Sequence, residues 1–70
     1  MREYITNKVN TLRNERGVTQ EDLAEKVQVS RQTIIAIEKG NYTPSVLLAL
    51  KFAHFFEVSV EDIFKISYEK

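Results

Sequence analysis

Residues 19–40 read TQEDLAEKVQVSRQTIIAIEKG, and this stretch contains two short segments with the apolar spacing of a helix. Thr19 and Ser30 stand just before the two segments, where a side-chain oxygen caps the first turn of a helix. The stretch predicts one helix ending at Val27 and a second starting at Ser30, joined by a turn of three or four residues. The apolar positions expected to lock the two helices together are Leu23, Val27, Val29, Ile34 and Ile37.

The second predicted helix carries an unusual set of outward side chains. Arg31, Gln32 and Thr33 occupy its first turn, and Ile35 and Ala36 follow. Arginine can bind guanine O6 and N7 with two hydrogen bonds, and glutamine can do the same with adenine N6 and N7. The methyl groups of the other three residues suit contact with a thymine methyl. A face chosen for solubility would carry Glu and Lys, so this face is expected to read base edges in a major groove.

The rest of the chain predicts three more helices and a tail with the alternation of a strand. Thr6 or Asn7 is expected to cap a first helix that stops at Gly17, Ser45 to cap a fourth, and Ser59 with Asp62 to cap a short fifth. In the tail, Phe64, Ile66 and Tyr68 alternate with polar residues, as in a strand. The tail either pairs with REYI at the N-terminus or is frayed, because an isolated two-stranded ribbon is marginal in water.

Length and composition limit the architecture and the function. The chain has 70 residues, no cysteine, 43% hydrophobic and 29% charged residues, so we expect one domain spanning residues 1–70. Its short loops favour a helical bundle. No apolar run approaches the roughly 18 residues of a membrane span, and the N-terminus lacks a signal-peptide core. We therefore expect a cytoplasmic protein without membrane contact.

Formal net charge is zero, but the charges are unevenly distributed along the chain. Between Lys26 and Lys51 the positive residues are Lys26, Arg31, Lys39 and Lys51, against Glu38 alone, which gives +3. Between Phe52 and Phe64 there are three acids and no Lys or Arg, which gives −3. A local basic face that attracts nucleic acid is therefore compatible with zero net charge.

These motifs together resemble the Cro/repressor-type helix-turn-helix family of phage and bacterial regulators, also called the xenobiotic-response-element family. The resemblance covers roughly residues 7 to 64 and rests on Thr19-Gln20, Leu23-Ala24, Val29 to Ile34, Ile37-Glu38, Gly40, Pro44-Ser45, Leu48 to Leu50 and Glu61 to Phe64. It implies an all-α, five-helix, lambda-repressor-like bundle. The short chain resembles small stand-alone repressors, which add a C-terminal β-hairpin or small sheet.

The resemblance also implies a partner and a mode of binding. The expected partner is double-stranded DNA with a palindromic operator, bound by a homodimer whose two third helices enter major grooves about 34 Å apart. Base contacts fall on Arg31, Gln32, Thr33, Ile35 and Ala36. Phosphate contacts fall on Gln20, Ser30, Lys39, Asn41 and Tyr42. Arg13 and Glu38 match positions that form a buried structural ion pair in the family, the alternative being two unrelated surface charges.

The chain departs from the family pattern at two positions. Many members have glycine where this chain has Gln28, and Gly or Asn where it has Glu57. Each residue must either accept a positive φ, at a cost of about 1 kcal/mol, or sit in a different turn.

Several large apolar residues are left over once the predicted core is filled. We expect Leu47, Phe55, Val60, Ile66 and Tyr68 to form the homodimer interface, the alternative being local packing against the tail.

The only histidine, His54, is expected at the surface. The sequence shows no catalytic constellation, metal-ligand cluster, cofactor motif or small-molecule site. The prediction is a DNA-binding transcriptional regulator, a repressor rather than an activator; the alternative is a protein-interaction module such as an antitoxin-like partner.

Overall fold

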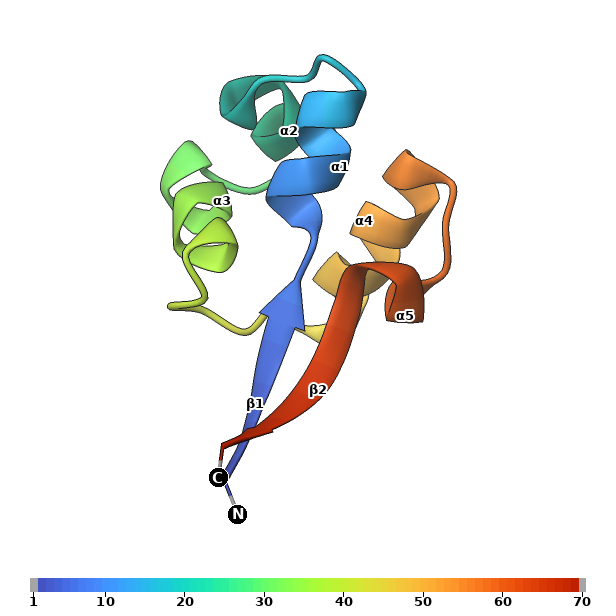
Figure 1. Ribbon diagram of the computed structural model, residues 1–70. Helices are drawn as coiled ribbons and strands as arrows, with labels where there is room; N and C mark the ends of the chain where they lie inside the picture. Colours follow the sequence, from blue (N-terminus) through green and yellow to red (C-terminus); the bar gives the residue numbers. More distant parts are fainter. Residues whose placement is uncertain (1, 70) are drawn as a thin grey trace.

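A computed structural model describes residues 2–69, which form five helices between two strands (Figure 1). In chain order the elements are β1 (Arg2–Asn7), α1 (Val9–Glu15), α2 (Gln20–Val27), α3 (Arg31–Glu38), α4 (Val46–Phe56), α5 (Val60–Ile63) and β2 (Phe64–Glu69). The five-helix, lambda-repressor-like architecture is confirmed, and so is the pair of terminal strands.

Four helices begin where a hydroxyl side chain caps the first turn. The hydroxyls of Thr19, Ser30, Ser45 and Ser59 each accept a hydrogen bond from the backbone N–H three residues later. At α2 and α5 the third helical residue is an aspartate whose carboxylate accepts a hydrogen bond from the backbone N–H of the capping residue, which completes a capping box. These starts are the ones that the sequence predicts.

The start of α1 differs from the prediction, because neither Thr6 nor Asn7 is its N-cap. Both residues belong to β1, and α1 follows Lys8, which makes no side-chain cap. Pairing of Asn7 with Phe64 and the bond from the Lys8 N–H to the Ile63 carbonyl (2.9 Å) extend the strand to this point. Tertiary pairing therefore outweighs the local capping preference, although the Asn7 side chain still accepts a hydrogen bond from the Val9 N–H.

Gln28 and Glu57 both adopt the left-handed conformation, with φ of 64° and 59°. They end α2 and α4 at the two positions where the chain departs from the family pattern, which is Gly at the first and Gly or Asn at the second. Of the two alternatives, a positive φ or a different turn, the structure has the positive φ at both residues. Both helices therefore end with backbone strain that a glycine would not have.

The helices enclose one apolar core. Phe52 and Phe56 of α4 are fully buried, and the Phe52 ring meets that of Phe64 at 6.0 Å between centroids. The remaining buried apolar residues are Val9, Leu23, Ala24, Val27, Ile34, Ile37, Leu48, Ala53 and Ile63. This core fixes the relative positions of α2 and α3.

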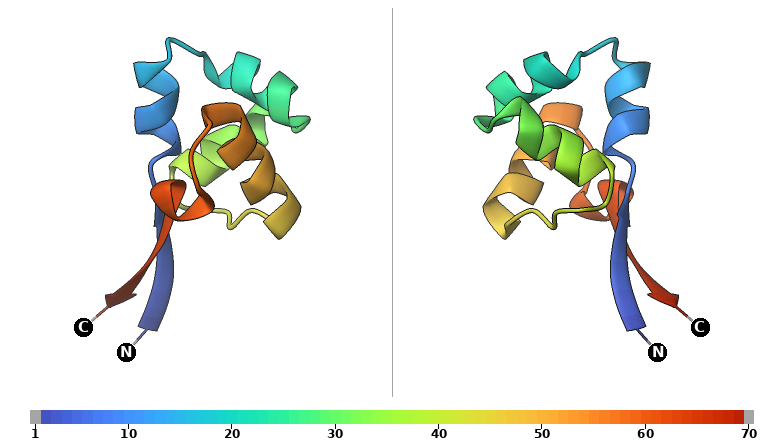
Figure 2. Two further views of the ribbon diagram at one scale, coloured as in Figure 1. Left: turned by 90° about the vertical axis from the view of Figure 1, so that its right-hand side faces the viewer. Right: turned by 90° about the vertical axis from the view of Figure 1, so that its left-hand side faces the viewer.

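The two strands form an antiparallel ribbon that projects from the helical body and pairs Arg2 with Glu69 at its tip (Figures 1 and 2). Ile5 pairs with Ile66, and Glu3 with Tyr68. Because neighbouring residues in a strand point to opposite faces, Ile5, Ile66 and Tyr68 share one face. That face leads into the core at Phe64, and its outer part is exposed.

Candidate nucleic-acid interface

The second and third helices form a helix-turn-helix unit on one side of the molecule. The turn runs from Gln28 to Ser30, and the Val29 N–H donates to the Ala24 carbonyl at 2.9 Å, which closes the end of α2. Buried Leu23, Val27 and Ile34 join the two helices. In the right-hand view of Figure 2, α3 lies at the front of the body with its outer face free. This helix is accessible to a large, extended partner.

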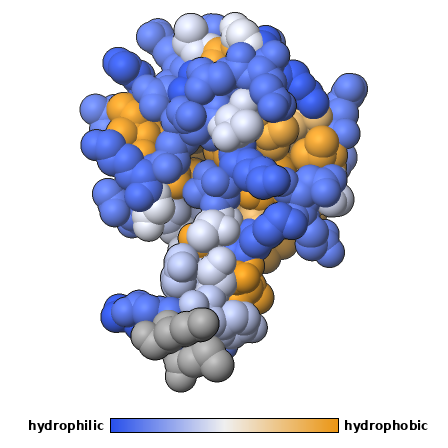
Figure 3. Space-filling view, viewed as in Figure 1, coloured by the Kyte–Doolittle hydropathy of each residue, from blue (hydrophilic) through white to orange (hydrophobic). Residues whose placement is uncertain are grey.

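The first turn of α3 presents two free polar side chains. Arg31 and Gln32 are exposed, and within residues 2–69 neither side chain makes a hydrogen bond. Ile35 and Ala36 are half-buried, so each offers only part of its surface. Figure 3 shows apolar atoms among hydrophilic ones over α3. The face can therefore combine directed hydrogen bonds with methyl contacts.

Ser30 and Thr33 are engaged with each other. The Ser30 hydroxyl accepts from the Thr33 N–H at 3.2 Å, and the two hydroxyl oxygens lie 3.0 Å apart. Because the two hydroxyls engage each other, the methyl group of Thr33 is left for contact with a partner. The hydroxyl pair keeps one lone pair or proton for a further hydrogen bond at the start of α3.

The end of α3 carries the other candidate contact residues. Gly40 has a φ of 79°, and the Asn41 N–H donates to the Ala36 carbonyl at 2.9 Å, so the chain turns sharply there. Lys39, Asn41 and Tyr42 all lie exposed around this turn. The cation, amide and phenol suit the oxygen atoms of a phosphate backbone.

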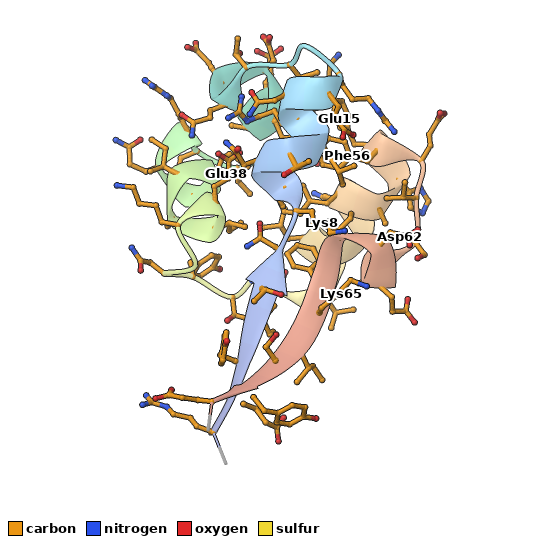
Figure 4. The ribbon with its side chains drawn as sticks, viewed as in Figure 1. Lys8, Glu15, Glu38, Phe56, Asp62 and Lys65 are labelled. Atoms are coloured by element: carbon orange, nitrogen blue, oxygen red, sulfur yellow. The ribbon has the colours of Figure 1, made fainter. Side chains whose placement is uncertain are left out.

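Glu38 is the centre of a polar network that ties three helices together. The Arg13 Nε donates to Glu38 Oε2 at 2.8 Å, and the side chains of the pair are 11% and 6% exposed. Asn10 of α1 and Gln20 of α2 each donate to Glu38 Oε1 at 3.1 Å. Figure 4 shows Glu38 lying between α3 and α1. The network sets how α3 sits against the two preceding helices.

Two opposing effects decide the pKa of Glu38. Partial burial raises it, whereas the hydrogen bonds from Arg13, Asn10 and Gln20 and the charge of Arg13 lower it. The net effect is a pKa below the ordinary value, so the carboxylate stays ionised and keeps its donors at neutral pH.

The side chain and the backbone N–H of Gln20 differ in whether they have a hydrogen-bond partner within the protein. Its side-chain amide donates to Glu38, whereas its backbone N–H lies in the first turn of α2, where a helix has no internal acceptor. The backbone N–H of Gln20 is therefore the group available to an anion, while its side chain ties α2 to Glu38.

The four cations of the basic middle segment separate in the structure. Arg31 and Lys39 lie at the two ends of α3. Lys26 and Lys51 instead line a groove between the end of α2 and α4. The run of positive charge in the sequence therefore supplies two cations to the face of α3 rather than four.

The five candidate dimer residues lie on three elements, β2, α5 and α4. Ile66 and Tyr68 are 61% and 57% exposed on the ribbon, and Val60 is half-buried at the start of α5. Leu47 and Phe55 line the groove on α4, together with the exposed His54. The left-hand view of Figure 2 has the ribbon on one side and the start of α4 on the other.

Sequence reasoning missed Asn10 and Leu50. Asn10 lies one helical turn before Arg13, a spacing that puts both on one face toward Glu38. Leu50 lies one turn after Leu47 and is 45% exposed. Both spacings are visible in the sequence. Whether such a residue contacts Glu38 or lies exposed depends on which side of the helix faces the core.

The described residues contain neither a metal-ligand cluster nor a membrane-spanning helix. Among residues 2–69 no three His, Cys, Asp or Glu side chains are grouped closely enough to hold a metal ion. None of the helices in this part of the chain has the length and apolar character needed to cross a membrane.

Proteins similar to this chain are also of the helix-turn-helix type. Residues 9–63 match the helix-turn-helix family. An uncharacterized HTH-type transcriptional regulator of Methanocaldococcus jannaschii is 62% identical over 60 residues, which cover 86% of this chain and 91% of that protein. A similar regulator of Bacillus subtilis is 53% identical over the same shares.

A solved structure extends the comparison to the fold. The restriction-modification controller protein C.AhdI of Aeromonas hydrophila superposes with a TM-score of 0.73 at 25% identity, over 79% of this chain and 83% of that one. The chain belongs to the helix-turn-helix family of DNA-binding transcriptional regulators, of the Cro/repressor type. This family is not enzymatic, and its members here include archaeal as well as bacterial proteins, a wider range than the bacterial and phage origin that the sequence suggested.

Proposed function

We propose that this regulator is a repressor that binds a palindromic operator as a homodimer. The observation that carries the proposal is the first turn of α3, where Arg31 and Gln32 are exposed and free of internal partners. Groups that read bases must be available for hydrogen bonding and must also be held in position. Capping by Ser30 and the network around Glu38 supply that positioning.

Base reading is assigned to Arg31, Gln32 and Thr33, with Ile35 and Ala36 as methyl contacts. Phosphate contact is assigned to Ser30, Lys39, Asn41 and Tyr42 and to the backbone N–H of Gln20. Each bidentate base contact should discriminate by about 1–3 kcal/mol. The phosphate contacts give affinity and orientation without sequence preference.

Repression is favoured because it needs only occupancy of the promoter. A dimer seated on the operator excludes polymerase, whereas activation needs an additional surface that engages it. The operator symmetry follows from a two-fold dimer, because a symmetric protein presents the same reading face twice.

The dimer surface is assigned to the exposed face of the ribbon with Val60. Ile66 and Tyr68 leave apolar area in water on an element that is marginal alone, and a second copy would cover it. Leu47 and Phe55 belong to this surface only if the dimer also reaches α4.

Selection of bound sites from a random double-stranded DNA pool tests the proposal directly. The expected result is an enriched palindrome whose half-sites are one helical turn apart. Weak, salt-sensitive binding with no enriched sequence would refute specific recognition. That result would favour the alternative, a protein-interaction module, for which the exposed apolar groove on α4 is the supporting observation.

A further inference from the structure

The groove between α2 and α4 combines an apolar floor with basic edges. Leu47, Leu50 and Phe55 supply the apolar surface, and the first two side chains are 64% and 45% exposed. Lys26 flanks the groove from α2, and Lys51 flanks it from α4. Among residues 2–69 no acidic side chain lines it. From these features we propose that the groove docks an acidic amphipathic helix of another protein.

The shape of the groove suits a helix. From Leu47 to Phe55 the groove-lining residues of α4 extend over about 12 Å, the length of two turns. Both walls are helices, so the groove offers side chains and no free strand edge. A helix that inserts apolar residues at intervals of three and four positions fits such a surface, whereas an added strand would find no backbone partners.

The basic edges select the charge of the occupant. Lys51 donates one hydrogen bond, from its Nζ to the Gln28 Oε1 at 2.8 Å, which draws the ammonium to the end of α2, where Lys26 also lines the groove. Two of its three N–H groups remain free for a carboxylate. With Lys26 also at the end of α2, a bound helix would meet two positive charges along that side of its apolar stripe, which favours Asp and Glu there.

A second copy of this chain fits the groove poorly. A two-fold contact places the same patch against itself, so Lys26 and Lys51 would face their own counterparts. Like charges brought together in an interface disfavour the contact. Insertion of the acidic end of another copy, near Glu57 and Glu61, would instead propagate an open chain of molecules. Leu47 and Phe55 are therefore better assigned to a different protein than to the homodimer.

The groove is also clear of the DNA-reading face. In the left-hand view of Figure 2, α4 and α5 lie in front of α3, on the side away from its outer surface. A helix docked there would leave Arg31 and Gln32 free. The proposal consequently stands independently of the operator and of repression.

Panning a phage-displayed library of random peptides against the full chain tests the proposal. The expected peptides are rich in Asp and Glu and carry apolar residues at helical spacing. The double variant Lys26→Glu, Lys51→Glu should select basic peptides instead. No enrichment, enrichment without acidic bias, or an unchanged selection by the double variant would each overturn the proposal.

Single substitutions then locate the binding. Leu50→Ser should weaken binding of an enriched peptide about tenfold, because it removes apolar area from the groove floor. The matched control is Val46→Ser, an exposed apolar residue on the same helix outside the groove, which should bind as the parent does. Both variants should retain DNA binding, which shows that they fold. Equal peptide binding by both variants, or loss of self-association in Leu50→Ser alone, would contradict the assignment, the second by pointing to a second copy as the occupant.

Discussion

Gln28 and Glu57 carry side chains at backbone positions that suit glycine. Their positive φ values bring Cβ close to the following carbonyl, which costs about 1 kcal/mol or more per residue. At Gln28 part of this cost is offset, because its side chain accepts a hydrogen bond from Lys51. The end of α2 is thus strained in its backbone and tied to α4 by its side chain.

Replacing Gln28 should separate these two contributions. Gln28→Ala and Gln28→Gly both lose the bond to Lys51, but only glycine relieves the backbone. Gln28→Gly should therefore be more stable than Gln28→Ala by about 1 kcal/mol, measured by urea unfolding. An alanine variant as stable as the glycine variant would show that this turn is not strained.

Glu38 makes the free energy of unfolding depend on pH in the acid range. Because its pKa is lowered on folding, its contribution is complete above the unfolded pKa of about 4.3 and is lost as pH falls through the lower folded value. Glu38→Gln should cost about 2 kcal/mol at neutral pH, since Arg13 then lacks a charged acceptor. The difference from the parent should shrink at acid pH.

Urea unfolding of both proteins from neutral to acid pH measures this effect. The variant should keep some acid sensitivity, because the pKa of Asp62 is also lowered, first by the hydrogen bond from the Ser59 backbone and then by its hydroxyl. A constant gap between the two proteins at every pH would show that the carboxylate charge of Glu38 contributes nothing to stability.

At the scale of elements, the two ends of α3 should have separable effects on DNA binding. Gln32→Ala should lose about 1–3 kcal/mol of discrimination at one base position in each half-site and leave the others unchanged. Site selection with the variant measures it. An unchanged base preference would mean that α3 enters the groove in a different register.

Lys39→Ala should act on every sequence alike. Loss of one phosphate contact should weaken specific and non-specific DNA equally and reduce the salt slope by about 1 per site. Binding titrations at several salt concentrations measure both quantities. A loss confined to the operator would instead assign Lys39 to base reading.

How well an element could be predicted depended on the range of the interactions that form it. The starts of α2 and α5 follow from Thr19, Ser59 and the aspartates three residues later, so local sequence was enough. The start of α1 was mispredicted, because pairing of Asn7 with Phe64 is invisible to local pattern. The groove was missed for the same reason, since Lys26 and Leu50 meet only after α2 packs on α4.

At the scale of the whole molecule, the ribbon should control assembly. Ile66→Glu places a charge on its apolar face and should convert a dimer to a monomer, as measured by sedimentation velocity. Operator affinity should then fall about a hundredfold, because two half-sites no longer bind as one unit. Half-site affinity should not change.

Lys65→Glu provides the matched control, because it alters the neighbouring residue on the opposite face of β2. It should leave the dimer intact. If Ile66→Glu also remained dimeric, the ribbon would not be the assembly surface, while base reading by α3 would be unaffected.

The ribbon also determines how the molecule would respond to mechanical force. Because β1 and β2 are antiparallel, Arg2 and Glu69 pair at the tip of the ribbon (Figure 1). Tension applied to the two ends would load the pairs one after another, as in unzipping, rather than all together in shear. The strands would part from Arg2 toward Asn7 at low force, and the bond from Lys8 to Ile63 would be the last to break before the helices bore any load.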